Sequence, residues 1–204
     1  MTNNGKGTET FMISVIIPTF NRGYTLAQVL DSYYRQQFVA ELIIVDDGGS
    51  DKTAVVVDEF VRKYPRIKTM YLKNEKRQGA PYSRRRGLLA ADGEFVLFGD
   101  DDDFLEENYT TVCLNKLKSL SADIVSGRHF FRTPGETVAE AIARFGQGSI
   151  DVPPFDFRLF YINTDAKFKS DVELPFTHAI YLVRRELLLS YEMDTFYSRG
   201  NGFR

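Results

Sequence analysis

Short apolar, β-branched runs alternate with helix-like segments along the chain, and this alternation constrains the fold more than any other feature. Strands are expected at residues 13–18, 41–45, 67–72 and 95–98, with further strands near 124–130 and 176–183. Helices are expected between them, at about residues 26–33, 50–61, 81–91, through Cys113 and after Val183. Strands that alternate with helices are typical of a mostly parallel sheet with helices on both faces. The sequence therefore predicts a single α/β domain.

Local signals sharpen two of these helices. Ser50 is expected to cap the helix that carries Val55 and Phe60, because serine accepts hydrogen bonds from the first free N–H groups of a helix. Pro81 suits the first turn of the next helix, where its missing N–H has no partner to lose.

The composition limits the classes of function. The 204 residues are 43% hydrophobic and carry a net charge of −2, so the chain can form one sizeable core and has no overall attraction to nucleic acid or anionic lipid. The single cysteine excludes an intramolecular disulfide and a zinc site built from several thiolates. Cys113 lies on a helical stripe of apolar residues, which predicts a small core residue.

The N-terminal residues 1–10 are polar and are expected to form a disordered tail. They contain no apolar segment of the kind found in a signal peptide. No apolar run elsewhere is long enough to cross a bilayer. We therefore expect a cytoplasmic protein without a transmembrane segment, with peripheral contact to the inner face of the membrane as a second option.

Three polar clusters each begin where a predicted strand ends. They are residues 19–22, Asp46 with Asp47, and the four aspartates at residues 100–103. In open α/β sheets, ligands bind just beyond the carboxyl ends of the strands. These clusters are therefore expected to meet at one edge of the sheet.

Four consecutive aspartates repel one another unless cations or donors neutralise them. In an extended stretch, Asp100 and Asp102 would point the same way. Carboxylate oxygens suit Mg²⁺ or Mn²⁺, which often bind through one or two carboxylates plus substrate phosphates. The alternative is a solvated acidic loop in which an aspartate caps the next helix.

A basic stretch lies between the acidic clusters and could neutralise a diphosphate. Part of it must face solvent, because three successive helical residues point in different directions. The patch is short and the net charge acidic, so RNA binding is less favoured. The chain contains neither a P-loop motif, nor G-x-G-x-x-G, nor G-x-S-x-G. The cations are Lys73, Lys76, Arg77, Arg84, Arg85 and Arg86.

Taken together, these blocks resemble the family-2 glycosyltransferases of the GT-A fold. The matching segments are residues 14–22, 41–51, 83–87, 91–103 and 179–186. The resemblance implies a single GT-A-like domain with a nucleotide-sugar-binding half at 11–132 and an acceptor-side half at 133–204. Acceptor choice would then depend on the irregular region 133–173.

The resemblance also implies a set of site residues and a Mn²⁺ or Mg²⁺ cofactor. Asp47 would accept a hydrogen bond from the base, and Arg84 would approach that base. Asp100 would face the ribose and sugar, and Asp102 would hold the metal that bridges the diphosphate. The expected nucleotide-binding residues are Pro18, Thr19, Asn21, Arg22, Asp46, Asp47, Arg84, Asp100 and Asp101, and the expected metal ligands are Asp102 and Asp100.

Two positions depart from the family pattern, and both could alter donor choice. Arg85 stands where the family often has asparagine, and Gly99 replaces the usual apolar residue before the acids.

The implied reaction is a metal-dependent, inverting transfer of a sugar from a nucleotide diphosphate sugar, most often a UDP-sugar, to a carbohydrate, lipid-linked or protein acceptor. In relatives the catalytic base lies in an acidic pair after the helix that begins at Arg184–Glu186. Here the base is expected beyond Arg204, as in a C-terminally truncated chain, and Asp194 is a less favoured substitute.

Two other interpretations stay open. The first is a non-catalytic nucleotide-binding module that keeps the pocket and lacks the base. The second is a receiver-like or phosphatase-like domain, which also gathers aspartates at strand ends but needs a lysine on a neighbouring strand end.

Overall fold

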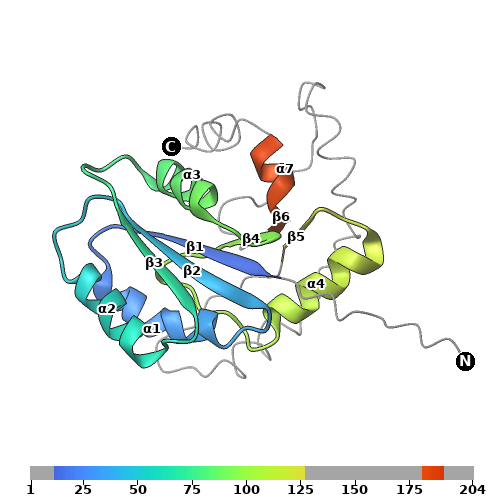
Figure 1. Ribbon diagram of the computed structural model, residues 1–204, viewed down its shortest axis with the longest axis horizontal. Coiled ribbons are helices and arrows are strands. Elements are labelled where there is room, and N and C mark those ends of the chain that lie inside the picture. Colours follow the sequence, from blue (N-terminus) through green and yellow to red (C-terminus); the bar gives the residue numbers. More distant parts are fainter. Residues whose placement is uncertain (1–11, 127–180, 191–204) are drawn as a thin grey trace, which may run out of the picture.

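The computed structural model describes residues 12–126 and 181–190, and a six-stranded sheet forms the centre of this part (Figure 1). The strand order is β3-β2-β1-β4-β6-β5, and only β6 runs antiparallel to its neighbours. The predicted mostly parallel α/β architecture is therefore confirmed. In chain order the elements are β1 (Ile13–Thr19), α1 (Gly23–Tyr34), β2 (Val39–Asp46), α2 (Thr53–Lys63), β3 (Lys68–Lys73), α3 (Ala80–Ala90), β4 (Phe95–Phe98), α4 (Tyr109–Leu120), β5 (Ile124–Ser126), β6 (Tyr181–Arg184) and α7 (Arg185–Ser190).

Strand β1 is the point at which the strand order of the sheet reverses. It pairs with β2 on one side, where Thr19 lies opposite Asp46, and with β4 on the other, where Ile16 lies opposite Phe98. The chain adds β2 and β3 on the first side before it crosses to β4. Such a reversal opens a crevice at the carboxyl ends of the two strands that flank it.

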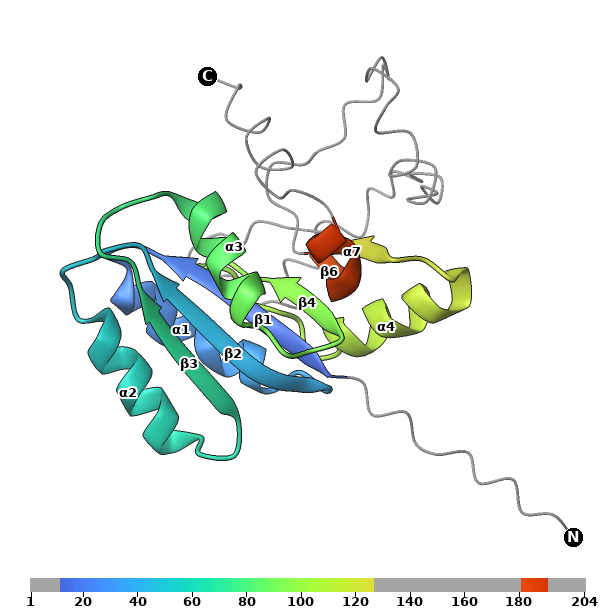
Figure 2. The same cartoon turned by 45° about the horizontal axis from the view of Figure 1, so that its top comes forward.

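Helices cover both faces of the sheet, as predicted. Helices α1, α2 and α4 lie on one face, and α3 and α7 lie on the other (Figure 2). Alternate residues of β1 serve the two layers: Val15 and Ile17 pack toward α1, whereas Ile16 packs toward α3. The site-bearing strand β1 is thereby fixed from both sides.

Cys113 on α4 is a core residue, as its position on an apolar stripe predicts. It is 4% exposed, and burial raises the pKa of its thiol to about 11. A thiol with that pKa is almost entirely protonated at neutral pH, so Cys113 is not a reactive nucleophile.

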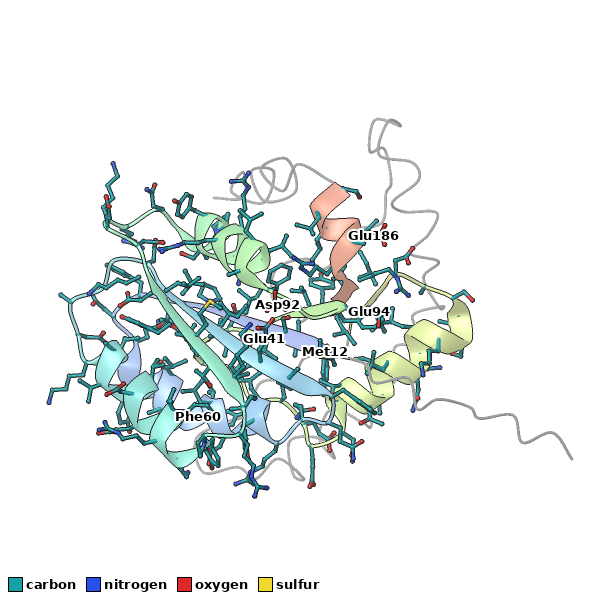
Figure 3. The ribbon with its side chains drawn as sticks, in the orientation of Figure 1. Met12, Glu41, Phe60, Asp92, Glu94 and Glu186 are labelled. Carbon is teal, nitrogen blue, oxygen red and sulfur yellow. The ribbon has the colours of Figure 1, made fainter. Side chains whose placement is uncertain are left out.

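A buried carboxylate ties together the amino end of the sheet. Glu41 of β2 accepts hydrogen bonds from the Ser14 hydroxyl at 2.5 Å and from the Asp92 N–H at 2.6 Å, and its other oxygen lies 2.9 Å from Lys68 Nζ (Figure 3). These partners come from β1, β3 and the α3–β4 loop. The network therefore joins three strands and a loop at the edge opposite the predicted site.

One local prediction is wrong: Asp51, rather than Ser50, provides the side-chain contact at the start of α2. The helix begins at Thr53, too far along the chain for the Ser50 hydroxyl to reach its first N–H groups. The Asp51 carboxylate instead accepts from the Thr53 N–H at 3.1 Å and from the Thr53 hydroxyl at 2.6 Å. Pro81 does lie in the first turn of α3, as predicted.

Several predicted segments lie outside the described residues: the tail at 1–10, residues 127–130, the irregular region 133–173, and the first part of the strand expected at 176–183. Within 12–126 and 181–190, no helix has the length and apolar character needed to cross a bilayer.

Candidate functional site

The carboxyl ends of β1, β2 and β4 lie at one edge of the sheet, and their loops are tied together by backbone hydrogen bonds. The Asp47 N–H donates to the Thr19 carbonyl at 2.8 Å, and the Gly99 N–H donates to the Ile16 carbonyl at 2.9 Å. All three polar clusters singled out in the sequence therefore begin at this edge.

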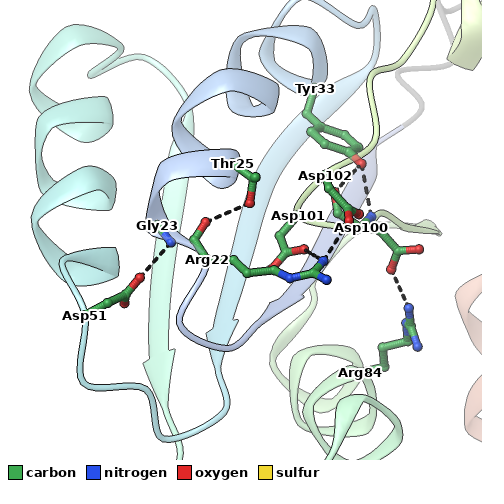
Figure 4. A network of polar contacts seen from close by, with 9 residues as sticks. All are labelled: Arg22, Gly23, Thr25, Tyr33, Asp51, Arg84, Asp100, Asp101 and Asp102. Carbon is green, nitrogen blue, oxygen red and sulfur yellow. Dashed lines mark hydrogen bonds and ion pairs between the residues drawn. The ribbon is translucent and has the colours of Figure 1, made fainter. Parts of the chain in front are cut away.

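Arg22 from the β1–α1 loop reaches across to the acidic turn that follows β4 (Figure 4). Its Nη1 atom lies 3.0 Å from Asp101 Oδ1 and 2.7 Å from Asp102 Oδ2. The Arg22 and Asp102 side chains are 53% and 50% exposed, whereas that of Asp101 is only 7% exposed. The Arg22 side chain thus bridges a buried and an exposed carboxylate, between the loops that follow β1 and β4.

Asp100 has a separate cation. Arg84 of α3 donates to Asp100 Oδ1 at 2.5 Å, and its side chain is 19% exposed. Each of the first three aspartates of the run therefore contacts an arginine, and the two arginines come from elements on opposite sides of the turn (Figure 4).

The expectation of an extended acidic stretch is wrong. The backbone turns at Asp101 and Asp102, and the Asp103 N–H points back to the Asp100 carbonyl at 3.5 Å. Asp100 consequently faces Arg84, while Asp102 faces Arg22. Turning the chain separates four like charges, which an extended strand would hold in two close pairs.

The Tyr33 side chain of α1 holds this turn through the backbone of Asp100. Its buried hydroxyl donates to the Asp100 carbonyl at 3.0 Å and accepts from the Asp100 N–H at 3.1 Å. Burial and the nearby Asp100 charge raise the Tyr33 pKa well above its usual value, so the hydroxyl stays protonated. Gly99 leaves room for this ring, since a Cβ there would lie 2.6 Å from the Tyr33 hydroxyl oxygen.

Asp101 is the electrostatically costly member of the turn. Burial raises the pKa of its carboxyl above the ordinary value, and contacts with Thr19 and Arg22 offset only part of that shift. The Thr19 hydroxyl is itself buried. It has no hydrogen-bond partner of good geometry within the described ranges, although it lies close enough to Asp101 to favour that carboxylate.

Asp46 points into the protein. The residue is 1% exposed, and its carboxylate accepts from the Gly49 N–H at 2.7 Å and from the Tyr71 hydroxyl at 2.5 Å. Burial and Asp46 together raise the Tyr71 pKa, which keeps that donor protonated. The structure therefore gives Asp46 a position in which it holds the loop that follows β2.

Asp47 also has its oxygens engaged by the protein. Its carboxylate accepts from Asn74 Nδ2 at 2.7 Å and from the backbone N–H groups of Gln78 and Gly79 at 2.8 and 2.7 Å. These contacts fix the loop that leads into α3. The Ser83 hydroxyl lies 3.4 Å from the same Oδ1 atom that accepts from Asn74 and Gln78, whereas of these donors only the Gly79 N–H contacts Oδ2. Oδ2 can therefore still take one further donor.

Asn21 links the first two loops. It adopts a left-handed backbone conformation with φ of 54°, and its Oδ1 accepts from the Ser50 and Asp51 N–H groups at 2.8 and 3.3 Å. Asp51 in turn accepts from the Gly23 N–H at 2.8 Å, at the start of α1. Pro18, by contrast, is buried within β1.

Sequence reasoning missed two contacts at this edge. The first is the Tyr33 hydroxyl, and the available signal was a tyrosine on an apolar helix face, because a buried phenol needs a polar partner. The second is a cation–π contact in which the Arg77 guanidinium lies 4.5 Å from the centre of the Phe20 ring. Nothing in the spacing of those two residues predicts that they meet.

The donor set suits a divalent cation that shares its coordination with a ligand. Within the described residues, no group of three or more acidic, histidine or cysteine side chains could hold a metal alone. Asp102 is half exposed in the turn that follows β4, and Asp100 in the same turn is one-third exposed. Mg²⁺ and Mn²⁺ fit such a site, because they can use one or two carboxylates together with phosphates and water.

These features define a GT-A-like α/β domain whose acidic turn lies at the topological switch point. A mannosyltransferase, PcManGT from Pyrobaculum calidifontis in complex with GDP-Man and Mn²⁺, matches with a TM-score of 0.55 at 23% identity, over 59% of this chain and 36% of that one. Staphylococcus aureus TarS 1–349 in complex with UDP matches with a TM-score of 0.50 at 28% identity, over 59% of this chain and 38% of that one.

The profile of Glycosyl transferase family 2 matches residues 14–189, and the chain belongs to this family. A GalNAc(5)-diNAcBac-PP-undecaprenol beta-1,3-glucosyltransferase of Campylobacter jejuni is 39% identical over 51% of this chain and 34% of the relative. The poly(ribitol-phosphate) beta-N-acetylglucosaminyltransferase TarP of Staphylococcus aureus is 30% identical over 78% of this chain and 49% of the relative. The chain thus spans between a third and a half of the length of these two relatives.

Proposed function

We propose that this chain binds a nucleotide diphosphate sugar together with Mn²⁺ or Mg²⁺ and serves as the donor-binding part of an inverting glycosyltransferase. One observation carries the proposal: Arg22, Asp101 and Asp102 meet where the loops that follow β1 and β4 come together, with Arg84 and Asp100 beside them. Carboxylates for a divalent ion and guanidinium groups for phosphates are the two kinds of group that a metal-bound diphosphate requires.

The roles follow from exposure and position. Asp102 would ligate the metal, since its carboxylate is half exposed at the carboxyl end of the sheet. Asp100 would lie on the ribose and sugar side and could share the ion. A bound metal would act as a Lewis acid that stabilises the negative charge of the departing diphosphate. Arg84, on the flank of the turn, would face the nucleotide.

The base and ribose would lie over the loops that follow β1 and β2. Thr19 presents a buried hydroxyl without a partner of good geometry in the described ranges, and Asn21 is exposed beside it. Asp47 would take one donor from the base in addition to its protein contacts. We expect UDP to be the preferred nucleotide, since TarS is in complex with UDP. GDP is the competing candidate, since PcManGT is in complex with GDP-Man.

The test is a thermal unfolding series with UDP, GDP and dTDP, each with and without Mn²⁺. A nucleotide that binds only the folded chain raises Tm, and UDP with Mn²⁺ should give the largest rise. If none of the three nucleotides raises Tm with Mn²⁺ present, the proposal fails.

A second measurement separates the enzyme from a non-catalytic nucleotide-binding module. With Mn²⁺ and a UDP-sugar, an enzyme should release UDP slowly by hydrolysis or rapidly by transfer to an acceptor. A chain that binds UDP tightly and releases no sugar from any UDP- or GDP-sugar would be the binding module.

A further inference from the structure

Arg22 occupies the same carboxylate that is proposed to hold the metal. Its Nη1 atom lies 2.7 Å from Asp102 Oδ2 and 3.0 Å from Asp101 Oδ1. Mg²⁺ lies about 2.1 Å from its oxygen ligands, so a metal on either oxygen of the Asp102 carboxylate would lie within a few ångströms of the Arg22 guanidinium. A divalent ion would repel a guanidinium held so close.

We infer that Arg22 is a built-in counterion of the acidic turn, which the divalent metal displaces from Asp102 and which Asp101 retains. The inference rests on the proposed function, since it assumes that Asp102 binds the metal. It adds that metal binding is an exchange of one cation for another, with the arginine as the resident competitor.

The two carboxylates differ in the way this exchange requires. Asp101 is 7% exposed and stays covered, so its contact with Arg22 is shielded from solvent. Asp102 is 50% exposed, and exposed ion pairs contribute little free energy. The Arg22 side chain is itself 53% exposed, so it can move off Asp102 without disturbing packed neighbours.

A second consequence concerns the order of binding. Once displaced from Asp102, the guanidinium keeps its contact with Asp101 and has donors free for a second anion, which a diphosphate bound beside the turn would supply. Metal alone should therefore bind weakly, because it pays the cost of releasing Arg22. Metal together with UDP should bind more tightly, because the released arginine gains a phosphate partner.

The experiment is a Mn²⁺ titration of the full chain without nucleotide, in which the electron paramagnetic resonance signal of free Mn²⁺ reports the unbound ion. Arg22→Gln should bind Mn²⁺ about fivefold more tightly than the wild type, the factor that one exposed ion pair can contribute. The matched control is Arg62→Gln, which removes the same charge from an exposed ion pair with Asp58 on α2. That control should bind Mn²⁺ as the wild type does.

Adding Asp102→Asn to Arg22→Gln should remove the gain, because the freed carboxylate is then absent. A gain that persists in the double variant places the ion elsewhere and overturns the inference. Equal Mn²⁺ affinity in the wild type and Arg22→Gln, or weaker binding by the variant, also overturns it, and so does an equal gain in Arg62→Gln.

Adding UDP to the same titrations distinguishes the two levels of the argument. If Mn²⁺ binds the wild type with UDP but Arg22→Gln shows no gain without UDP, the proposed function stands and the counterion exchange is wrong. If Mn²⁺ binds neither protein with UDP, GDP or without nucleotide, the metal site itself is wrong and both fall.

Discussion

Each end of the sheet holds a buried carboxylate, and the two carboxylates differ in the partners that surround them. At the amino end, Glu41 is buried and accepts from Ser14 and Asp92, with Lys68 beside it. At the carboxyl end, the buried Asp101 and the exposed Asp102 share one cation, the Arg22 guanidinium. The first carboxylate is enclosed by its partners, whereas the second is linked to a solvent-exposed cluster.

The direction of the pKa shifts separates the two edges further. At Glu41 burial opposes ionisation, but the hydrogen bonds from Ser14 and Asp92 and the Lys68 charge leave the pKa below its ordinary value. At Asp101 burial is the largest influence, and the pKa stays above its ordinary value despite Arg22. The amino-end network therefore favours the charged carboxylate, and the carboxyl-end cluster does not fully stabilise it. Carboxylates whose pKa is raised by burial cluster at functional sites.

The largest expected effect is on stability at the amino end. Glu41→Gln should lower the free energy of unfolding by about 3 kcal/mol, because it removes the charge of a buried carboxylate paired with Lys68 and turns an amide NH₂ group toward the Lys68 ammonium. Urea unfolding followed by circular dichroism measures this. Asp58→Asn, in an exposed pair on α2, is the control and should change the value by less than about 0.5 kcal/mol.

The second effect is on ligand binding at the carboxyl end. Asp102→Ala should weaken Mn²⁺-dependent UDP binding at least about tenfold, since even indirect loss of metal support costs that much. Its free energy of unfolding should change by less than about 0.5 kcal/mol, because the side chain is half exposed. Isothermal titration calorimetry with and without Mn²⁺ measures the affinity. Unchanged affinity together with unchanged metal dependence would show that Asp102 is not a metal ligand.

The sequence predicted the frame of this comparison but not its details. Strand ends could be located from the apolar runs, so the meeting of Arg22 with the acidic run follows from parallel topology. The turn at Asp101 could not be predicted, because it depends on the Tyr33 hydroxyl, which comes from a helix far away along the chain. The inward orientation of Asp46 could not be predicted either, since it depends on Tyr71 of β3. Long-range side-chain partners leave no local pattern.

Tyr33 offers a test of whether the acidic turn is held from behind. Tyr33→Phe removes both hydrogen bonds to the Asp100 backbone and should lower the free energy of unfolding by about 1 kcal/mol. It should also weaken Mn²⁺-dependent UDP binding, because the turn loses its fixed position. Tyr64→Phe is the matched control: its hydroxyl donates to Asp31 at 3.0 Å, remote from the turn. A loss of UDP affinity in both variants, or in neither, would remove Tyr33 from the site.

The smallest effect, and the most direct test of the contrast between the edges, is the pH dependence of stability. The lowered pKa of Glu41 means that its contribution is full above the ordinary value of 4.5 and is lost as pH falls through the lower folded value. The raised pKa of Asp101 acts in the opposite sense: its contribution is present below the ordinary value of 3.8 and is lost as pH rises through the higher folded value. Asp101→Asn should therefore gain stability relative to the wild type as pH rises above 3.8, whereas Glu41→Gln should lose stability relative to the wild type as pH rises toward 4.5. Urea midpoints measured between acid and neutral pH give both slopes. Slopes of the same sign would mean that folding favours the same protonation state in both carboxylates. The proposed difference between the amino-end and carboxyl-end carboxylates would then be wrong.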